Sequence, residues 1–473
     1  MKPLTKAICL LLVSQGLSLG ALAAELQFGP AFTSGMVLQR ETPIHITGEG
    51  PAGREITVSL GAQQQTAKID AAGQWQVIFD PMFAGGAYRL QVTAGNTQVT
   101  LEDVLIGDVW LFSGQSNMQL GLGEALGGSA ALAAAQSNAP VRLLSVPKAG
   151  AATPQENLGA AWVHCSPKAL RRFSAVAWFC ATRLRQDSAL TNIPLGLIDS
   201  SFGGSAIEAW MPVETLPHLP ENQRSASMFG IPPGQLYNQM IFPLRAYRIK
   251  GVCWYQGEAN AGHPADYAQL LQNLIAQWRR QWQQPDLPFF IVQLPAYAGR
   301  VDGLDFSWLR EAQAQACRET SRTWLAVTFD TTAGFDLHPS EKQEISRRLA
   351  LLIRQEVYGE DLPAHGPGLE SVKTEADAVR VTFDQPVTVP PGETPVGFEL
   401  AGADGEYYYA HAEITGCQGL LRAASVPAPE TVRYAWGPQP RANLTSLISL
   451  PATPFRTDHQ TPDTLVFQPL PEL

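Results

Sequence analysis

Short segments in which apolar and polar residues alternate dominate the first hundred residues of the chain. They are 44–47, 55–60, 74–78 and 88–92, and turn-forming stretches rich in glycine separate them. A period of two residues is typical of half-buried strands, and turns at intervals of about 8 to 12 residues are typical of a small antiparallel sandwich. We therefore expect an N-terminal β-sandwich-like domain over residues 24–102.

The pattern changes between residues 103 and 358. Five apolar runs, each of strand length, occur at 104–112, 194–198, 249–255, 288–294 and 323–329. Between the third and fourth runs, apolar residues recur at steps of three and four from Tyr267 to Trp282, which predicts a helix with one buried face. A second helix is expected after the fifth run, where Ser340 and Gln343 have capping-box spacing. Strands that alternate with helices predict an α/β domain with a parallel sheet covered on both faces.

The last part of the chain returns to alternation. A passage rich in proline and glycine at 362–368 leads into alternating segments such as 379–383 and 431–436. We expect a second β-rich domain over residues 359–473, so that two β domains flank the α/β domain.

The first 23 residues have the pattern of a secretory signal peptide. Lys2 and Lys6 precede a short apolar run, and Ala21-Leu22-Ala23 follows it as an A-x-A cleavage signal. The run is shorter than the ~20 residues that span a bilayer, so the pattern disfavours a membrane anchor. We expect a protein that is exported to the periplasm or secreted.

Charge and cysteine content exclude some classes of protein. The formal net charge is −10 with 43 acidic residues, which disfavours non-specific binding to nucleic acid. Five cysteines remain after the signal peptide, widely scattered, so one disulfide is conceivable but a disulfide scaffold is not needed. The sequence contains neither a C-x-x-C nor an HExxH motif, so residue spacing does not predict a metal site.

Polar residues follow four of the five strand-like runs. These segments are 113–118, 199–205 and 256–260 after the first three runs, and Asp330 with 334–339 after the fifth. Open α/β sheets bind ligands outside the carboxyl ends of their strands. We therefore expect these segments to meet at one edge of the sheet.

The segments supply the groups that acyl transfer requires. Such a reaction needs a hydroxyl nucleophile, an imidazole that accepts its proton and a carboxylate that orients the imidazole. We predict Ser116 as the nucleophile, His338 as the base and Asp336 as the carboxylate, with Asp330 or Glu258 as alternatives to Asp336. The nucleophile elbow G-x-S-x-G is absent because Met118 occupies its last position, which argues against a standard α/β-hydrolase.

The same edge offers donors for an oxyanion and rings for a sugar. We predict that the Gly204 amide and the Gln256 side chain form the oxyanion hole. Trp254, Tyr255 and Trp210 are the candidate substrate-binding aromatic residues, with core packing as their alternative role.

Four ordered blocks, 107–118, 196–211, 254–260 and 336–343, resemble the bacterial sialate O-acetylesterase family, which belongs to the SGNH hydrolases. Similarity extends to both flanks, at 34–40 and 450–458. The resemblance implies a flavodoxin-like core and a Ser-His-Asp mechanism without metal or other cofactor, acting on acetyl esters of sugars. By position, Ser116, His338 and Asp336 match the family's triad. In the third block Asn260 competes with Gln256, which we prefer because it lies nearer the strand end.

The expected substrate is an O-acetylated carbohydrate, most simply an acetylated sialate. An acetylated plant polysaccharide such as xylan or pectin is the first alternative, because fold alone does not determine the substrate. A glycan-binding protein that has lost catalysis is the alternative from another class.

Overall fold

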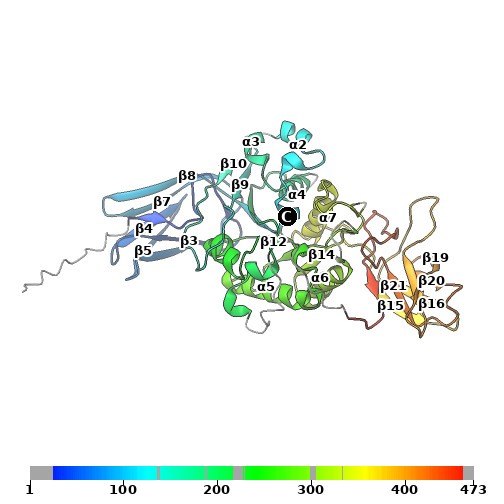
Figure 1. The fold of residues 1–473 in the computed structure, drawn as a ribbon. Helices are drawn as coiled ribbons and strands as arrows, with labels where there is room; N and C mark the ends of the chain where they lie inside the picture. The colour runs from blue at the N-terminus through cyan, green and yellow to red at the C-terminus, as the bar shows by residue number, and fades with distance from the viewer. Residues whose placement is uncertain are drawn as a thin grey trace, which may run out of the picture.

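The computed structural model describes residues 25–135, 139–186, 189–216, 227, 229–298, 305–332 and 334–461. The predicted signal peptide, residues 1–23, lies outside the described residues. In Figure 1 the N-terminal β strands lie at one end of the molecule, the C-terminal strands at the other, and the helical part between them.

The N-terminal part consists of antiparallel strands, as the alternation predicts. One sheet has the order β1-β3-β6, formed by β1 (Gln27–Phe28), β3 (Ile44–Glu49) and β6 (Gln74–Phe79). In β6 every second residue is buried, so Trp75, Val77 and Phe79 face the core while their neighbours face solvent. The other strands are β4 (Glu55–Leu60), β5 (Gln63–Lys68) and β7 (Gly85–Ala94), which pair antiparallel with one another.

One long strand, β8 (Thr97–Gly114), belongs to two parts of the molecule. Its first half pairs with β7, and residues 105–107 pair with β2 (Val37–Gln39). Its second half is buried without interruption and is a central strand of the parallel sheet. The boundary predicted between 102 and 103 therefore falls inside a continuous strand, and the residues on its two sides share one apolar core.

The α/β part is built on a sheet of order β10-β9-β11-β8-β12-β13-β14, parallel except for β10. All five predicted runs are strands in it, which confirms the parallel sheet. The strands besides β8 are β9 (Val141–Ser145), β10 (Val163–His164), β11 (Leu195–Ser201), β12 (Gly251–Tyr255), β13 (Phe289–Val292) and β14 (Thr323–Ala326).

Helices cover both faces of this sheet (Figure 1). On one face α4 (Ala175–Arg185) packs against α7 (Gln343–Glu356), and on the other α5 (Tyr267–Gln281) packs against α6 (Ser307–Glu319). The predicted helix at 267–282 is confirmed as α5, which buries its apolar stripe. The remaining short helices include α1 (Ser116–Gln119), α2 (Gly128–Ala134) and α3 (Pro167–Leu170).

The C-terminal part has two four-stranded antiparallel sheets around a second apolar core. The first sheet contains β15 (Leu369–Thr374), β16 (Val379–Phe383), β20 (Gln418–Arg422) and β19 (His411–Thr415). The second contains β18 (Tyr407–Tyr409), β17 (Phe398–Ala401), β21 (Thr431–Tyr434) and β22 (Phe455–Arg456). All five cysteines after residue 23 are unpaired thiols, so the disulfide considered from the sequence is absent among them.

Candidate active site

The loops at the carboxyl ends of the parallel strands place the candidate nucleophile and base side by side. Ser116 follows β8 and opens α1, and His338 lies in the loop between β14 and α7. The Nε2 atom of His338 lies 2.8 Å from the Oγ atom of Ser116, although 222 residues separate them in the chain. Ser116 is half-buried and His338 reaches solvent. This is the distance at which an imidazole can accept the proton of a serine hydroxyl.

Burial and charge hold the imidazole in its neutral form at neutral pH. Burial lowers the pKa of His338, the charge of Lys342 lowers it further, and the Asp336 carboxylate opposes both. A base must be unprotonated to accept a proton, so these surroundings suit His338 to that task.

The three carboxylates considered for orienting His338 have different partners. Asp336 Oδ1 accepts a hydrogen bond from the backbone N–H of His338, at 2.9 Å. Asp330 accepts two hydrogen bonds from the Arg348 guanidinium, at 2.6 and 2.7 Å. Within the described part of the chain, no hydrogen bond joins a carboxylate to Nδ1 of His338. Asp336 therefore orders the backbone of the loop that carries the imidazole.

Glu258, the third of these carboxylates, belongs to a buried network that sequence reasoning did not assemble. The side chains of Asn117, Glu258 and Lys342 are buried directly beside Ser116 and His338. Asn117 donates to Glu258 and accepts from Lys342. The available signal was that Asn117 lies in the block of the nucleophile, Lys342 in the block of the base, and Glu258 in the third block, 254–260.

The glycines at the end of β11 approach the nucleophile closely. A Cβ atom on Gly203 would lie 3.5 Å from the Cβ of Ser116. The Gly203 amide donates to the Gln119 side chain at 2.7 Å, so its hydrogen is engaged. Gly204 is buried and has a φ of 67°, a conformation that favours glycine. The structure thus places Gly204, the predicted oxyanion donor, directly after a glycine whose missing side chain leaves room beside Ser116.

The prediction that Gln256 donates to an oxyanion is wrong for the geometry observed. Its side chain is buried, and its Nε2 atom donates to Ser205 O at 3.0 Å and to Asn260 Oδ1 at 2.7 Å. Both amide hydrogens are used, because a primary amide has two. Asn260, its competitor, is also buried and donates to Glu208 at 2.9 Å. The pair joins the loop after β12 to the loop after β11.

The prediction that Trp254, Tyr255 and Trp210 bind substrate is also wrong. All three side chains are fully buried. Trp254 packs edge-on against Trp210, with ring centroids 5.9 Å apart, and edge-on against Trp278 at 5.7 Å. The strand that carries Trp254 and Tyr255 is covered by helices on both sides, so neither face of it reaches solvent. An exposed ring occurs in the same loop as the base: Phe335, three residues before His338 in the chain, is 72% exposed.

In the part of the chain that the structure describes, no three His, Cys, Asp or Glu side chains are grouped as a metal ion would require. No helix in the same residues has the length and apolar character needed to cross a membrane.

Comparisons with known proteins agree with one another. A family model described as a carbohydrate esterase, sialic acid-specific acetylesterase, matches residues 106–347. The sialate O-acetylesterase of Rattus norvegicus is 30% identical over 537 residues, spanning 96% of this chain and 98% of the relative. The human sialate O-acetylesterase is 31% identical over 408 residues, 77% of each chain. A crystal structure of a carbohydrate acetylesterase from Xanthomonas citri is 36% identical, with a TM-score of 0.86 over 92% of this chain and all of that chain.

Proposed function

The chain belongs to the sialic acid-specific acetylesterase family of carbohydrate esterases and hydrolyses O-acetyl esters on sugars, and we propose that Ser116 is its nucleophile and His338 its general base. The family membership confirms the resemblance drawn from the four sequence blocks. The single observation that carries the proposed mechanism is the 2.8 Å contact between His338 Nε2 and Ser116 Oγ.

The proposed reaction has two halves. Ser116 Oγ attacks the carbonyl carbon of the acetyl group while His338 Nε2 accepts the hydroxyl proton. The imidazolium then returns that proton to the departing sugar oxygen, which leaves an acetyl ester on Ser116. In the second half His338 Nε2 takes a proton from water, whose oxygen attacks the acetyl carbonyl carbon. The bond between that carbon and Ser116 Oγ then breaks, acetate leaves, and the imidazolium returns the proton to Ser116 Oγ. Asp336 supports the base through the backbone of His338 and through its charge.

We assign the oxyanion hole to backbone amides. Gly204 directly follows Gly203, where an added Cβ would lie 3.5 Å from Ser116, and its buried position suits a donor to the tetrahedral intermediate. The amide of Ser116 itself is the second donor, because amides in the first turn of a helix have no acceptor within that helix. This assignment replaces the Gln256 side chain.

The substrate that we propose is an O-acetylated sialate. The support is the name of the relatives that span most of the chain, the sialate O-acetylesterases of rat and human. The neighbour from Xanthomonas citri is described more broadly as a carbohydrate acetylesterase. Acetylated xylan or pectin is therefore the alternative substrate class. Phe335 offers the exposed ring on which a sugar face would stack.

Export and the flanking domains belong to the same proposal. The signal-peptide pattern of residues 1–23 supports export to the periplasm or secretion.

The paired sheets of the N-terminal and C-terminal parts support β-sandwich-like domains on either side of a flavodoxin-like SGNH core. A glycan-binding protein without catalysis is the opposing interpretation, and the Ser116 and His338 contact argues against it.

Acetate release from two polymers tests this proposal. The mature protein, its Ser116→Ala variant and a Ser371→Ala control are compared on a 9-O-acetylated sialoglycan and on xylan of matched acetyl content. Ser371 lies exposed on β15, away from the site. We expect release from the sialoglycan, with kcat lowered about 10⁶-fold by Ser116→Ala and unchanged by the control. Release from xylan alone would overturn the sialate assignment, and release that survives Ser116→Ala would overturn the mechanism.

A further inference from the structure

The Asn117 side chain has all its hydrogen-bonding groups engaged at the centre of three elements. Its Nδ2 atom donates to Glu258 Oε1 at 2.5 Å and to the Leu337 carbonyl at 2.9 Å. Its Oδ1 atom accepts from Lys342 Nζ at 2.6 Å. Asn117 and Lys342 are fully buried and Glu258 nearly so. Water therefore cannot substitute for a lost partner without entering the core.

The charges on either side fix the orientation of this amide. The carboxylate of Glu258 faces the Asn117 NH₂ group, and the ammonium group of Lys342 faces its oxygen. Rotating the amide by half a turn would set donor against donor at Lys342 and acceptor against acceptor at Glu258 and Leu337. The ammonium also lies 5.3 Å from the centre of the Tyr255 ring, a favourable cation–π distance. A single amide orientation is thus enforced.

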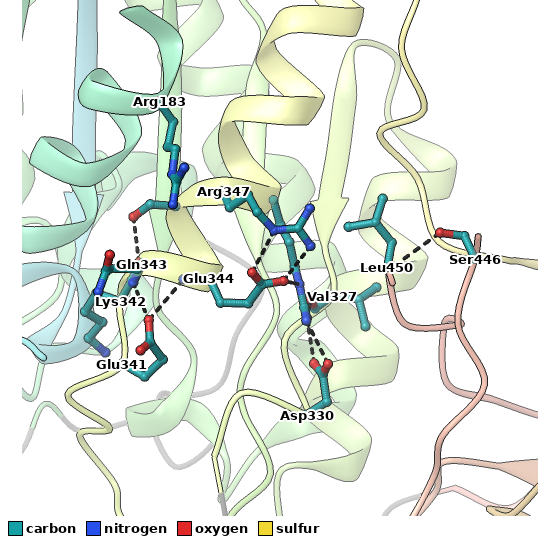
Figure 2. Close-up of polar contacts among 12 residues, drawn as sticks. Arg183, Val327, Asp330, Glu341, Lys342, Gln343, Glu344, Arg347, Ser446 and Leu450 are labelled. Carbon is teal, nitrogen blue, oxygen red and sulfur yellow. Dashed lines mark hydrogen bonds and ion pairs between the residues drawn. The ribbon is translucent and has the colours of Figure 1, made fainter. Parts of the chain in front are cut away.

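The bonds of Asn117 connect the two reacting residues through the chain. Asn117 directly follows Ser116, and Leu337 directly precedes His338. The hydrogen bond between Asn117 and Leu337 therefore joins the turn that carries Ser116 to the loop between β14 and α7 that carries His338, which we call the base loop. Each end of this bond is one residue away from a reacting residue. Lys342 lies at the N-terminal end of α7, where the same loop ends (Figure 2). Glu258 adds the loop after β12 as a third attachment.

We propose that Asn117, Lys342 and Glu258 are positioning residues for the proposed reaction, a buried bracket that holds His338 Nε2 at hydrogen-bonding distance from Ser116 Oγ. This inference rests on the proposed function. The bracket acts on the backbone of the loop at Leu337, as Asp336 does at the His338 N–H, so the two constrain neighbouring residues of the same loop.

The bracket has an electrostatic consequence at His338. Burial lowers the pKa of Lys342 to about 8, and Glu258, Asp336 and Glu341 oppose that shift, so the amine is mostly protonated at pH 7. Burial raises the pKa of Glu258, opposed by the Asn117 hydrogen bond and by the charge of Lys342. The charged groups that act on His338 are Lys342, which lowers its pKa, and Asp336, which raises it. Losing Lys342 therefore raises the pKa of the base.

Two substitutions in the full mature chain separate the mechanical role from the electrostatic one. Asn117→Ala removes the link to Leu337, and Lys342→Met removes the charge and the donor while keeping a long side chain. We expect Asn117→Ala to lower kcat about 10²-fold with KM changed less than twofold, because a small misplacement of reacting atoms has this effect. We expect Lys342→Met to lower kcat as well and to move the acid limb of the kcat/KM profile to higher pH, so that activity falls more at pH 6 than at pH 8.

Arg347→Met is the matched control. Arg347 is a cation on the same helix, paired with Glu344 away from the site (Figure 2), and its loss should leave kcat and the pH profile unchanged. Activities are referred to the folded fraction from near-UV circular dichroism and thermal unfolding. The proposal is overturned if Asn117→Ala and Lys342→Met keep kcat per folded molecule within twofold, or if the acid limb does not move in Lys342→Met. An active Ser116→Ala variant would instead overturn the underlying function, so the two failures are distinguishable.

Discussion

Asp336 influences His338 through a backbone bond and through charge, and two substitutions separate these effects. Asp336→Asn keeps an oxygen that can accept from the His338 N–H but removes the charge that raises the pKa of the imidazole. Because kcat/KM requires neutral His338 and falls below its pKa, the acid limb should move to lower pH in Asp336→Asn. We expect Asp336→Ala, which also loses the hydrogen bond, to lower kcat the more. Equal losses near 10⁴-fold in both variants would show instead that Asp336 acts on the ring itself.

We expect substitution of Phe335 to change KM and substitution of Trp254 to change stability. Phe335 is exposed in the loop that carries His338, and Trp254 is buried between Trp210 and Trp278. Phe335→Ala should raise KM for the acetylated sugar severalfold without changing the melting temperature. Trp254→Ala should lower the free energy of unfolding by about 3 to 5 kcal/mol, as other large truncations in cores do. Kinetics and denaturant unfolding of both variants check this, and a Trp254→Ala variant of unchanged stability with raised KM would restore the sugar-binding role.

Among the elements, α7 shows how local sequence sets the position of the base loop. The cap of this helix differs from the predicted capping box: Glu341, and not Ser340, accepts from the N–H groups of Gln343 and Glu344, at 2.7 and 3.1 Å (Figure 2). The spacing correctly predicted that a helix starts here. Because the first helical residue is Gln343, the acceptor for its first N–H groups is Glu341 and not Ser340.

Removing that cap should destabilise the protein by a small, measurable amount. Glu341→Ala leaves two N–H groups of α7 without their acceptor and should lower the free energy of unfolding by about 1 kcal/mol. Glu413→Ala, an exposed glutamate in the strand β19, is the control and should have no comparable effect. Urea unfolding measures both, and equal midpoints would show that Glu341 does not cap α7.

The sequence predicts β8, β11, β12, β13 and β14 because strands buried on both faces appear as continuous apolar runs. It does not predict β9, in which Arg142 interrupts the apolar residues, or the two-residue strand β10. It does not reveal that β8 continues for 18 residues through the expected domain boundary, since its outer half alternates like the strands before it. Nor does the sequence show whether Trp254, near the end of β12, is buried in the core or exposed where substrate could bind. An aromatic residue in an apolar run gives the same pattern in both cases. Ser116 and His338 are predictable from their blocks, whereas the partners of Gln256 and Asn117 depend on packing between distant loops.

In the whole molecule, the C-terminal part contacts the loops that carry the site. The Tyr297 amide donates to Pro438 O at 2.8 Å, and the neighbouring Ala298 amide donates to Gly334 O at 2.6 Å. Gly334 lies four residues before His338 in the same loop and has a φ of 86°. A Cβ atom added to Gly334 would lie 2.7 Å from the Gln439 side chain. The segment 437–439 therefore limits where the base loop can lie.

A methyl group at Gly334 tests this contact. Gly334→Ala should lower kcat by between about threefold and tenfold, because the added methyl group overlaps the Gln439 side chain and we expect part of the displacement to fall on the loop. Gly405→Ala is the matched control, since Gly405 has a φ of 73° but open space around its Cβ position. Both substitutions strain the backbone, but we expect only the first to change kcat. Equal kcat values in the two variants would show that the C-terminal part does not constrain the base loop.

The central claim is that Ser116 is the residue that becomes acylated, and covalent labelling tests it most directly. The protein is treated with a phosphonylating serine-hydrolase probe, and the modified peptide is located by mass spectrometry in the native chain, Ser116→Ala and His338→Ala. We expect a single label on Ser116 that acetylated substrate prevents, that His338→Ala slows strongly and that Ser116→Ala abolishes. A label on another residue, together with acetate release that persists in Ser116→Ala, would contradict the account.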